Sequence, residues 1–189
     1  MKKKAIKELT LILFSAIIIA LLINKFVIFQ SYIPSDSMFP TLKVGDKVIV
    51  RVVYNTDKLH RGDIVVFYNR ERNETMIKRL IGLPNDIINI SKGKVSVNGE
   101  YLMDISDEAG INMVEDVRYI VPNDSFFFLG DNRNNSLDSR YWENPYIHED
   151  DIVGKALIKY SSLRDIKLLK WGVMIWTLKK VWIIYYLLQ

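Results

Sequence analysis

The sequence of 189 residues contains no cysteine and only two histidines, His60 and His148. Without cysteine, the chain cannot form disulfides, use a thiol nucleophile or build a cysteine-rich zinc site. Both histidines lie in polar, charged stretches, where histidine is usually an ordinary surface residue. We therefore expect neither a multi-histidine metal centre nor a buried histidine that acts as a base.

The net charge is small, +4 at pH 7, and it is unevenly distributed. Residues 1–30 and residues 161–189 each contain five basic residues and one acid, so each end contributes +4. The stretch between them has 16 basic and 20 acidic residues, which gives −4. Basic ends beside apolar sequence indicate a protein that faces a membrane, and no nucleic-acid partner is expected.

A long apolar run covers residues 9–29, without a charge between Glu8 and Lys25. As a helix it would measure roughly 30 Å, about the thickness of a hydrocarbon core. The basic residues 1–8 predict a cytoplasmic N-terminus, a single transmembrane anchor and an extracytoplasmic remainder. A cleaved signal peptide is the alternative, but the run is longer than usual and no clean small-x-small cleavage site follows it.

The body of the chain, residues 30–160, alternates turn signals with short β-branched or alternating runs. Such spacing predicts an all-β fold of coiled antiparallel sheets that form a small β-domain. Val97–Glu100 reads as a tight hairpin turn. The strand-like stretches are residues 45–50, 61–67, 83–90, 93–102, 125–131 and 152–160.

The C-terminal tail, residues 161–189, is rich in aromatic and aliphatic residues but is interrupted by Lys179 and Lys180. Two lysines at the bilayer centre would cost about 2.5–3.5 kcal/mol each, so a second span is disfavoured. We expect an interfacial segment, and a terminal strand pair packed on the sheet is the alternative.

The most informative stretch is "SYIPSDSMFPTLKVGD", which places Ser35 and Ser37 around Asp36 and between two prolines. In an extended segment, residues two apart point the same way, so the two hydroxyls can converge on one carbonyl. A serine needs a base, and a buried lysine with a lowered pKa can serve. Lys78 shares a strand face with Met76 and Leu80, although an edge or snorkelling lysine is the plainer reading.

Four stretches, in this order, resemble the bacterial type I signal peptidases. "SDSMFPTLKVGD" is similar to the nucleophile box, "GDIVVF" to the next box, "IKRLIGLPND" to the lysine box and "LGDNRNNSLDSR" to the late box. The resemblance covers roughly residues 33–160 and includes "GKALIKY" near its end. Any one box alone would be a weak signal, whereas four in order are a strong one.

The resemblance implies a role for each matching residue. Ser37 would be the nucleophile and Lys78 the general base, while the Ser35 hydroxyl and the Ser37 N–H would form the oxyanion hole. Ser136 would hydrogen-bond Lys78 and orient its amine. A supporting charged network would consist of Asp131, Arg133, Asp138 and Arg140, together with Arg79.

Two positions depart from the family pattern, which usually has glycine at both. Asp36 stands inside the nucleophile box, where we expect its carboxylate to face solvent or a basic partner. Asn85 stands in the lysine box, where asparagine tolerates a positive φ. Neither change removes a group with a catalytic role.

The implied function is removal of signal peptides from exported preproteins at small-x-small sites through an acyl-enzyme, without a metal or other cofactor. The expected partners are signal peptides and the lipid bilayer, and the compact single-anchor form suggests a monomer in the cell membrane. Two alternatives stay open: an anchored β-domain that binds or assembles partners without cleavage, and a Ser/Lys peptidase dedicated to one partner.

Overall fold

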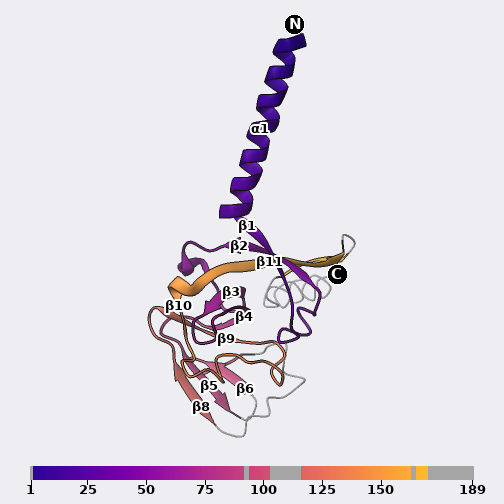
Figure 1. Ribbon diagram of the computed structural model, residues 1–189. Helices are drawn as coiled ribbons and strands as arrows, with labels where there is room; N and C mark the ends of the chain where they lie inside the picture. Colours follow the sequence, from indigo (N-terminus) through magenta and orange to yellow (C-terminus); the bar gives the residue numbers. More distant parts are fainter. Residues whose placement is uncertain (1, 92–93, 103–115, 163–164, 170–189) are drawn as a thin grey trace, which may run out of the picture.

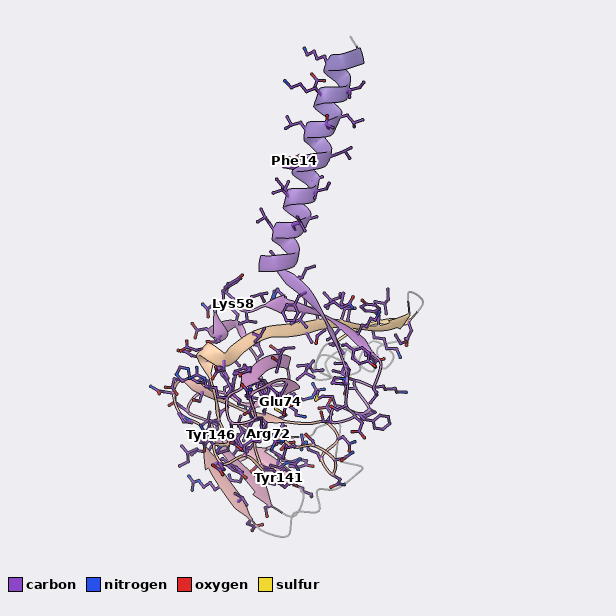
Figure 2. The ribbon with its side chains drawn as sticks, in the orientation of Figure 1. Phe14, Lys58, Arg72, Glu74, Tyr141 and Tyr146 are labelled. Carbon is purple, nitrogen blue, oxygen red and sulfur yellow. The ribbon has the colours of Figure 1, made fainter. Side chains whose placement is uncertain are left out.

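The computed structural model describes residues 2–91, 94–102, 116–162 and 165–169 of the chain. It consists of an N-terminal helix, α1 (Lys2–Phe26), followed by antiparallel β-structure (Figure 1). α1 extends away from the strands, and its Phe14 lies far from every one of them (Figure 2). In the described part of the chain, no helix meets the length and hydropathy needed to cross a membrane.

α1 ends before the apolar run does. The expected helical anchor continues to residue 29, whereas Ile28 and Phe29 belong to the first strand and pair with Arg51 and Val50. β-branched and aromatic residues favour strands. As a strand, these residues can also hydrogen-bond to the backbone of the partner strand, which a further helical turn would not reach. The strand was missed because its residues continue the apolar run without a break.

The strands form two sheets. The larger contains β1 (Ile28–Tyr32), β2 (Lys47–Val52), β3 (Ile64–Asn69), β4 (Glu74–Gly82), β9 (Ser125–Leu129), β10 (Ile147–His148), β11 (Ile152–Ser162) and β12 (Asp165–Leu168). Its order is β1-β2-β11-β3-β4-β9-β10, and β12 pairs with β11. The smaller contains β5 (Ile87–Ser91), β6 (Lys94–Val97), β7 (Glu100–Tyr101) and β8 (Val117–Ile120), in the order β7-β6-β5-β8. Two short 3₁₀ turns, Thr56–Lys58 and Glu149–Asp151, complete the described elements.

Each of the six strand-like stretches of the sequence contains a strand, so the mainly antiparallel β fold is confirmed. The hairpin between β6 and β7 turns at Asn98 and Gly99, with φ of 53° and 85°. Two positive φ values are what a type I′ turn requires. Asn85 also adopts a positive φ, 68°, so asparagine serves there as expected.

Side-chain alternation in β4 and β9 divides the core into layers. Leu80 and Phe128 point into a cluster that includes Phe67 and Trp142. Ile81, Phe127 and Leu129 face the opposite side and pack with apolar residues of the smaller sheet. β4 and β9 are thus covered on both faces, so residues at their ends are held firmly.

The C-terminal tail is described only to residue 169. Residues Asp165–Leu168 form β12 beside β11, with Ile158 opposite Leu168. This is the strand pairing that the alternative reading of the tail expects. The interfacial segment was expected over residues 161–189, of which residues 163–164 and 170–189 lie outside the described residues.

Candidate active site

Ser37 lies in a turn and not in the extended strand that the sequence suggested. The N–H of Phe39 donates to the carbonyl of Asp36 at 2.9 Å, and the N–H of Leu42 donates to that of Met38 at 2.8 Å. Aspartate favours the first position of such turns, and prolines flank the segment, which explains the correction. The Oγ atoms of Ser35 and Ser37 are nevertheless 3.4 Å apart.

The turn is fastened at its base and by its apolar side chains. Ile33 exchanges backbone hydrogen bonds with Asp46 and Gly45 at 2.9 and 3.0 Å, which closes the loop that carries Ser37. Met38 and Leu42 are fully buried in the core cluster below it. Met38 is therefore a core residue, and Ser37 sits on a rigid support.

Lys78 lies in the middle of β4 and is only 3% exposed. Met76 and Leu80 both contact the same core cluster, as the alternation of the strand predicts. Within the described residues, the ammonium group of Lys78 has no hydrogen bond or ion pair. Burial of a cation without such a partner favours its neutral form.

Burial lowers the pKa of Lys78 from 10.5 to about 8. The carboxylates of Asp138 and Glu74 act in the opposite direction, and the guanidinium of Arg140 lowers the pKa further. Desolvation outweighs the attraction of the acids, so a neutral amine is available close to neutral pH. A lysine of this kind can accept a proton from a hydroxyl.

Gly130 joins the nucleophile turn to the lysine strand. Leu129 of β9 pairs with Arg79. Because the two strands are antiparallel, Gly130, which follows Leu129, lies opposite Lys78, which precedes Arg79. A Cβ atom on Gly130 would lie 2.1 Å from Ser136 Oγ and 2.5 Å from the carbonyl oxygen of Ser37. The absence of a side chain here lets the three segments meet.

Ser136 is buried, and its Oγ has no hydrogen-bond partner among the described residues. The hydrogen bond to Lys78 that the resemblance implies is thus not formed in this structure. The hydroxyl stands directly against Gly130 and beside the Ser37 carbonyl. It is therefore near the turn, and its orienting role stays a prediction.

Arg79 and Asp131 form a buried, bidentate ion pair. Nε and Nη2 of Arg79 each donate to a carboxylate oxygen of Asp131 at 2.6 Å. Nη1 of Arg79 donates to the carbonyl of Gly62 at 2.7 Å. Arg79 adjoins Lys78, and Asp131 adjoins Gly130. The ion pair therefore holds β4 against the loop after β9.

A second buried ion pair holds the loop itself. Arg140 donates to Asp138 through Nε at 2.7 Å and through Nη2 at 2.9 Å. Asp138 also accepts from the N–H of Gly130 at 2.9 Å, and Arg133 donates to the Gly130 carbonyl at 3.0 Å. Both backbone groups of Gly130 are thereby fixed by the charged residues.

Two asparagines of the same loop contact the nucleophile turn, and sequence reasoning missed both. The side-chain amide of Asn135 donates to the Asp36 carboxylate at 2.9 Å. The backbone N–H of Asn132 donates to the Ser37 carbonyl at 3.0 Å. Asp36 is exposed, as expected, but its partner is an amide and not a base. The only available signal was the amide-rich run "NRNN", which has no distinctive spacing.

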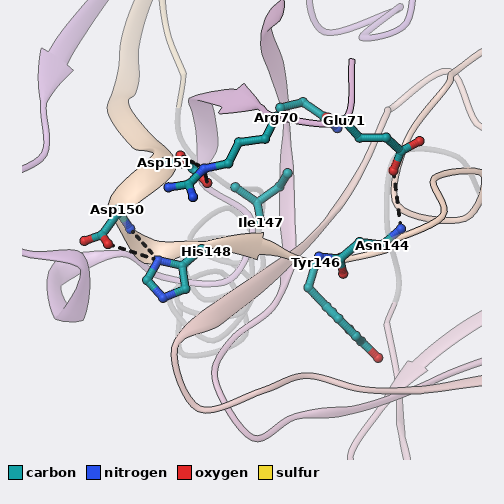
Figure 3. Close-up of a pocket in the computed structure, with 9 residues that line it drawn as sticks. Arg70, Glu71, Asn144, Tyr146, Ile147, His148, Asp150 and Asp151 are labelled. Carbon is teal, nitrogen blue, oxygen red and sulfur yellow. Dashed lines mark hydrogen bonds and ion pairs between the residues drawn. The ribbon is translucent and has the colours of Figure 1, made fainter. Parts of the chain in front are cut away.

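Neither histidine belongs to this site. His60 is exposed, and the side chain of His148 accepts from the N–H of Asp150 at 3.2 Å in a surface turn. His148 instead lines a hollow of about 250 Å³ whose rim includes the ion pair of Arg70 with Asp151 (Figure 3). None of the residues that line this hollow is a predicted site residue.

Several known proteins are similar to this chain in sequence. The family described as signal peptidase, peptidase S26, matches residues 6–161. A signal peptidase I of Leptolyngbya laminosa is 40% identical over 77% of this chain and 74% of its own length. Signal peptidase I U of Bacillus subtilis is 36% identical over 84% of this chain and 90% of its own length.

A signal peptidase I of Pseudomonas aeruginosa is 32% identical over 82% of this chain and 72% of its own length. A crystal structure of a signal peptidase I from Enterococcus faecalis V583 is 29% identical, with a TM-score of 0.46, over 52% of this chain and 96% of that one. The family match includes the helix, the nucleophile turn, the lysine strand and the late loop. This chain belongs to the signal peptidase family, peptidase S26.

Proposed function

We propose that this protein is a serine endopeptidase that removes N-terminal signal peptides from exported proteins, with Ser37 as nucleophile and Lys78 as general base. The observation that carries the proposal is the burial of Lys78, which brings its pKa to about 8. Two adjacent serine hydroxyls lie in the segment that Gly130 joins to the lysine strand, whereas both histidines of the chain lie elsewhere.

The pKa of Lys78 sets the proton transfers. At pH 7 about a tenth of the lysine is neutral, and at pH 8 about half. The neutral amine takes the proton of the Ser37 hydroxyl while Oγ forms a bond to the scissile carbonyl carbon. When the tetrahedral intermediate breaks its C–N bond, Lys78 gives that proton to the leaving amine. Water, activated by the same amine, then hydrolyses the acyl-enzyme.

The oxyanion of the intermediate would receive hydrogen bonds from the Ser35 hydroxyl and the Ser37 N–H. Among the described residues, the N–H of Ser37 donates to no other backbone group, so it is available to a substrate. Ser35 is exposed, with its Oγ 3.4 Å from that of Ser37. One such donor typically contributes about 10²–10³ in rate.

The substrate would bind as an extended strand along β4. β9 pairs with β4 only from Arg79 to Gly82. In the described part of the chain, the same edge of residues 74–78 therefore has no partner strand, and it leads to Lys78. Addition of a peptide strand to a free sheet edge is a common recognition mode, and it would bring a scissile bond towards Ser37.

α1 would anchor the enzyme in the cell membrane, with its basic N-terminus in the cytoplasm. Its large apolar side chains are exposed on the isolated helix, with Leu11 at 68% and Leu21 at 63%. Apolar side chains disfavour water, and lipid would cover them. The β-domain would then lie just outside the membrane, where the end of a membrane-embedded signal peptide emerges.

The direct test is cleavage of a preprotein that has an Ala-x-Ala site by the purified full-length protein. Ser37→Ala should abolish cleavage, and Ser96→Ala, in β6 of the smaller sheet, should leave it unchanged. A bulky residue in place of either alanine of the substrate should block the cut. Undiminished cleavage by Ser37→Ala would refute the assignment of the nucleophile.

The same assay separates the remaining functions. A wild-type protein that binds the preprotein without cutting it would indicate a binding or assembly module. A wild-type protein that cuts only one of several exported proteins with suitable sites would indicate a dedicated peptidase. The family match favours cleavage over binding alone.

A further inference from the structure

Asp36 occupies the start of the turn that presents Ser37. Its carbonyl accepts from the N–H of Phe39 at 2.9 Å, so Ser37 is the second residue of the turn. Its carboxylate accepts from the side-chain amide of Asn135 at 2.9 Å, although 99 positions separate the two residues. One residue thus defines the turn through its backbone and ties it to a distant loop through its side chain.

Two further hydrogen bonds connect the same two segments through backbone carbonyls of the turn. The side-chain amide of Asn132 donates to the Asp36 carbonyl at 3.2 Å, and its backbone N–H donates to the Ser37 carbonyl at 3.0 Å. Of these three hydrogen bonds, that of the Asp36 carboxylate uses a side chain of the nucleophile segment, whereas the other two use its backbone carbonyls. Substitution at Asp36 can therefore remove one bond and leave the other two in place.

The loop end that Asp36 holds is next to the proposed reaction centre. Asn135 directly precedes Ser136, whose Oγ lies against Gly130 beside the Ser37 carbonyl. A bond that fixes Asn135 to the turn therefore fixes the distance between the Ser37 turn and the Ser136 loop. Reacting groups need positions accurate to a fraction of an ångström for full rate.

We propose that Asp36 is a positioning residue whose carboxylate, by accepting from Asn135, holds the Ser37 turn in register with the loop that carries Ser136. The inference rests on the proposed function, because it concerns the placement of that nucleophile. Asp36 does not act through the base, since the charges that act on Lys78 are Asp138, Glu74, Arg140 and Asp131. It also touches no reacting atom, because its carboxylate faces the loop.

The test is a double-mutant cycle in the full-length protein, with kcat, KM, the pH profile of kcat/KM and the melting temperature measured for each variant. Asp36→Ala and Asn135→Ala should each lower kcat about tenfold, and the double variant should lose no more than either alone, because each removes the same bond. KM, the midpoint of the pH profile and the melting temperature should stay near those of the wild type.

Two further variants complete the design. Asp36→Asn keeps an oxygen that accepts from Asn135 and should retain most of the activity. Glu100→Ala, which removes an exposed acid from β7 of the smaller sheet, should behave as the wild type.

The inference would be overturned by kcat losses that multiply in the double variant, by Asp36→Asn as slow as Asp36→Ala, by a shifted pH midpoint, or by a kcat loss matched by a fall in melting temperature. Wild-type kcat in Asp36→Ala would also overturn it, while cleavage that still depends on Ser37 would leave the proposed function intact. A wild-type protein that fails to cleave would refute both.

Discussion

Replacement of Lys78 by methionine should stabilise the folded protein at pH 7 although it removes the proposed base. Lys78 is 3% exposed and has no hydrogen bond or ion pair within the described residues. Methionine has a similar length and no charge, so it can fill the same space beside Met76 and Leu80. Stability should increase because the substitution removes an ammonium group whose burial destabilises the folded state.

The pKa of Lys78 gives the size and the sign of the effect. A pKa lowered from 10.5 to about 8 corresponds to roughly 3 kcal/mol of disfavoured charge in the folded state. Below pH 8 both states are protonated and the wild type carries the full cost. Between pH 8 and 10.5 the folded state loses its proton while the unfolded state keeps it, so wild-type stability rises with pH.

The assay is chemical unfolding of full-length wild type and Lys78→Met in detergent at several values between pH 6 and pH 10. The variant should be more stable by up to about 3 kcal/mol below pH 8, and the difference should shrink towards pH 10.5. Lys47→Met removes an exposed lysine from β2 and should show no such pH-dependent gain. Equal stability at pH 7, or a difference that does not change with pH, would refute the reasoning.

Other substitutions probe the site and its support. Ser35→Ala should lower kcat by about 10²–10³ with little change in KM, because it removes an oxyanion donor, and steady-state kinetics will show whether KM rises instead. Gly130→Ala puts a Cβ 2.1 Å from Ser136 Oγ and 2.5 Å from the Ser37 carbonyl oxygen, so we expect at least a hundredfold loss of kcat, and wild-type turnover would contradict the packing. Gly82→Ala puts a Cβ within 2.9 Å of carbons in β5 and β9 side chains, which should cost about 1–3 kcal/mol in unfolding free energy, measured by denaturant titration.

Sequence patterns predicted the parts of the fold that depend on local signals. Asn98-Gly99 marks the β6–β7 hairpin because few other residue pairs accept two positive φ values. The central strands β3 and β9 are short apolar runs bounded by turn residues, and each was expected. β1 and β8 were missed, since one continues the apolar run of the helix and the other is a short alternating stretch.

The candidate site likewise combines features that local sequence patterns predict with contacts that they do not. A lysine between apolar residues of a strand is visible in the sequence, and burial does lower its pKa as that pattern predicts. The turn at Ser37 was read as extended because period-two spacing of serines fits a strand as well as a turn. The contact between Asp36 and Asn135 links residues 99 positions apart and depends on tertiary packing alone. Local patterns carry no information on such a pair.

The central claim is that Ser37 becomes acylated while Lys78 removes its proton. The most direct measurement is peptide mapping by mass spectrometry after a brief reaction of the full-length enzyme with a small-x-small peptide ester. The account predicts an acyl group on Ser37 in the wild type and none in Ser37→Ala or Lys78→Met. An acyl group on Ser35 or Ser136, or undiminished acylation of Lys78→Met at pH 8, would contradict it.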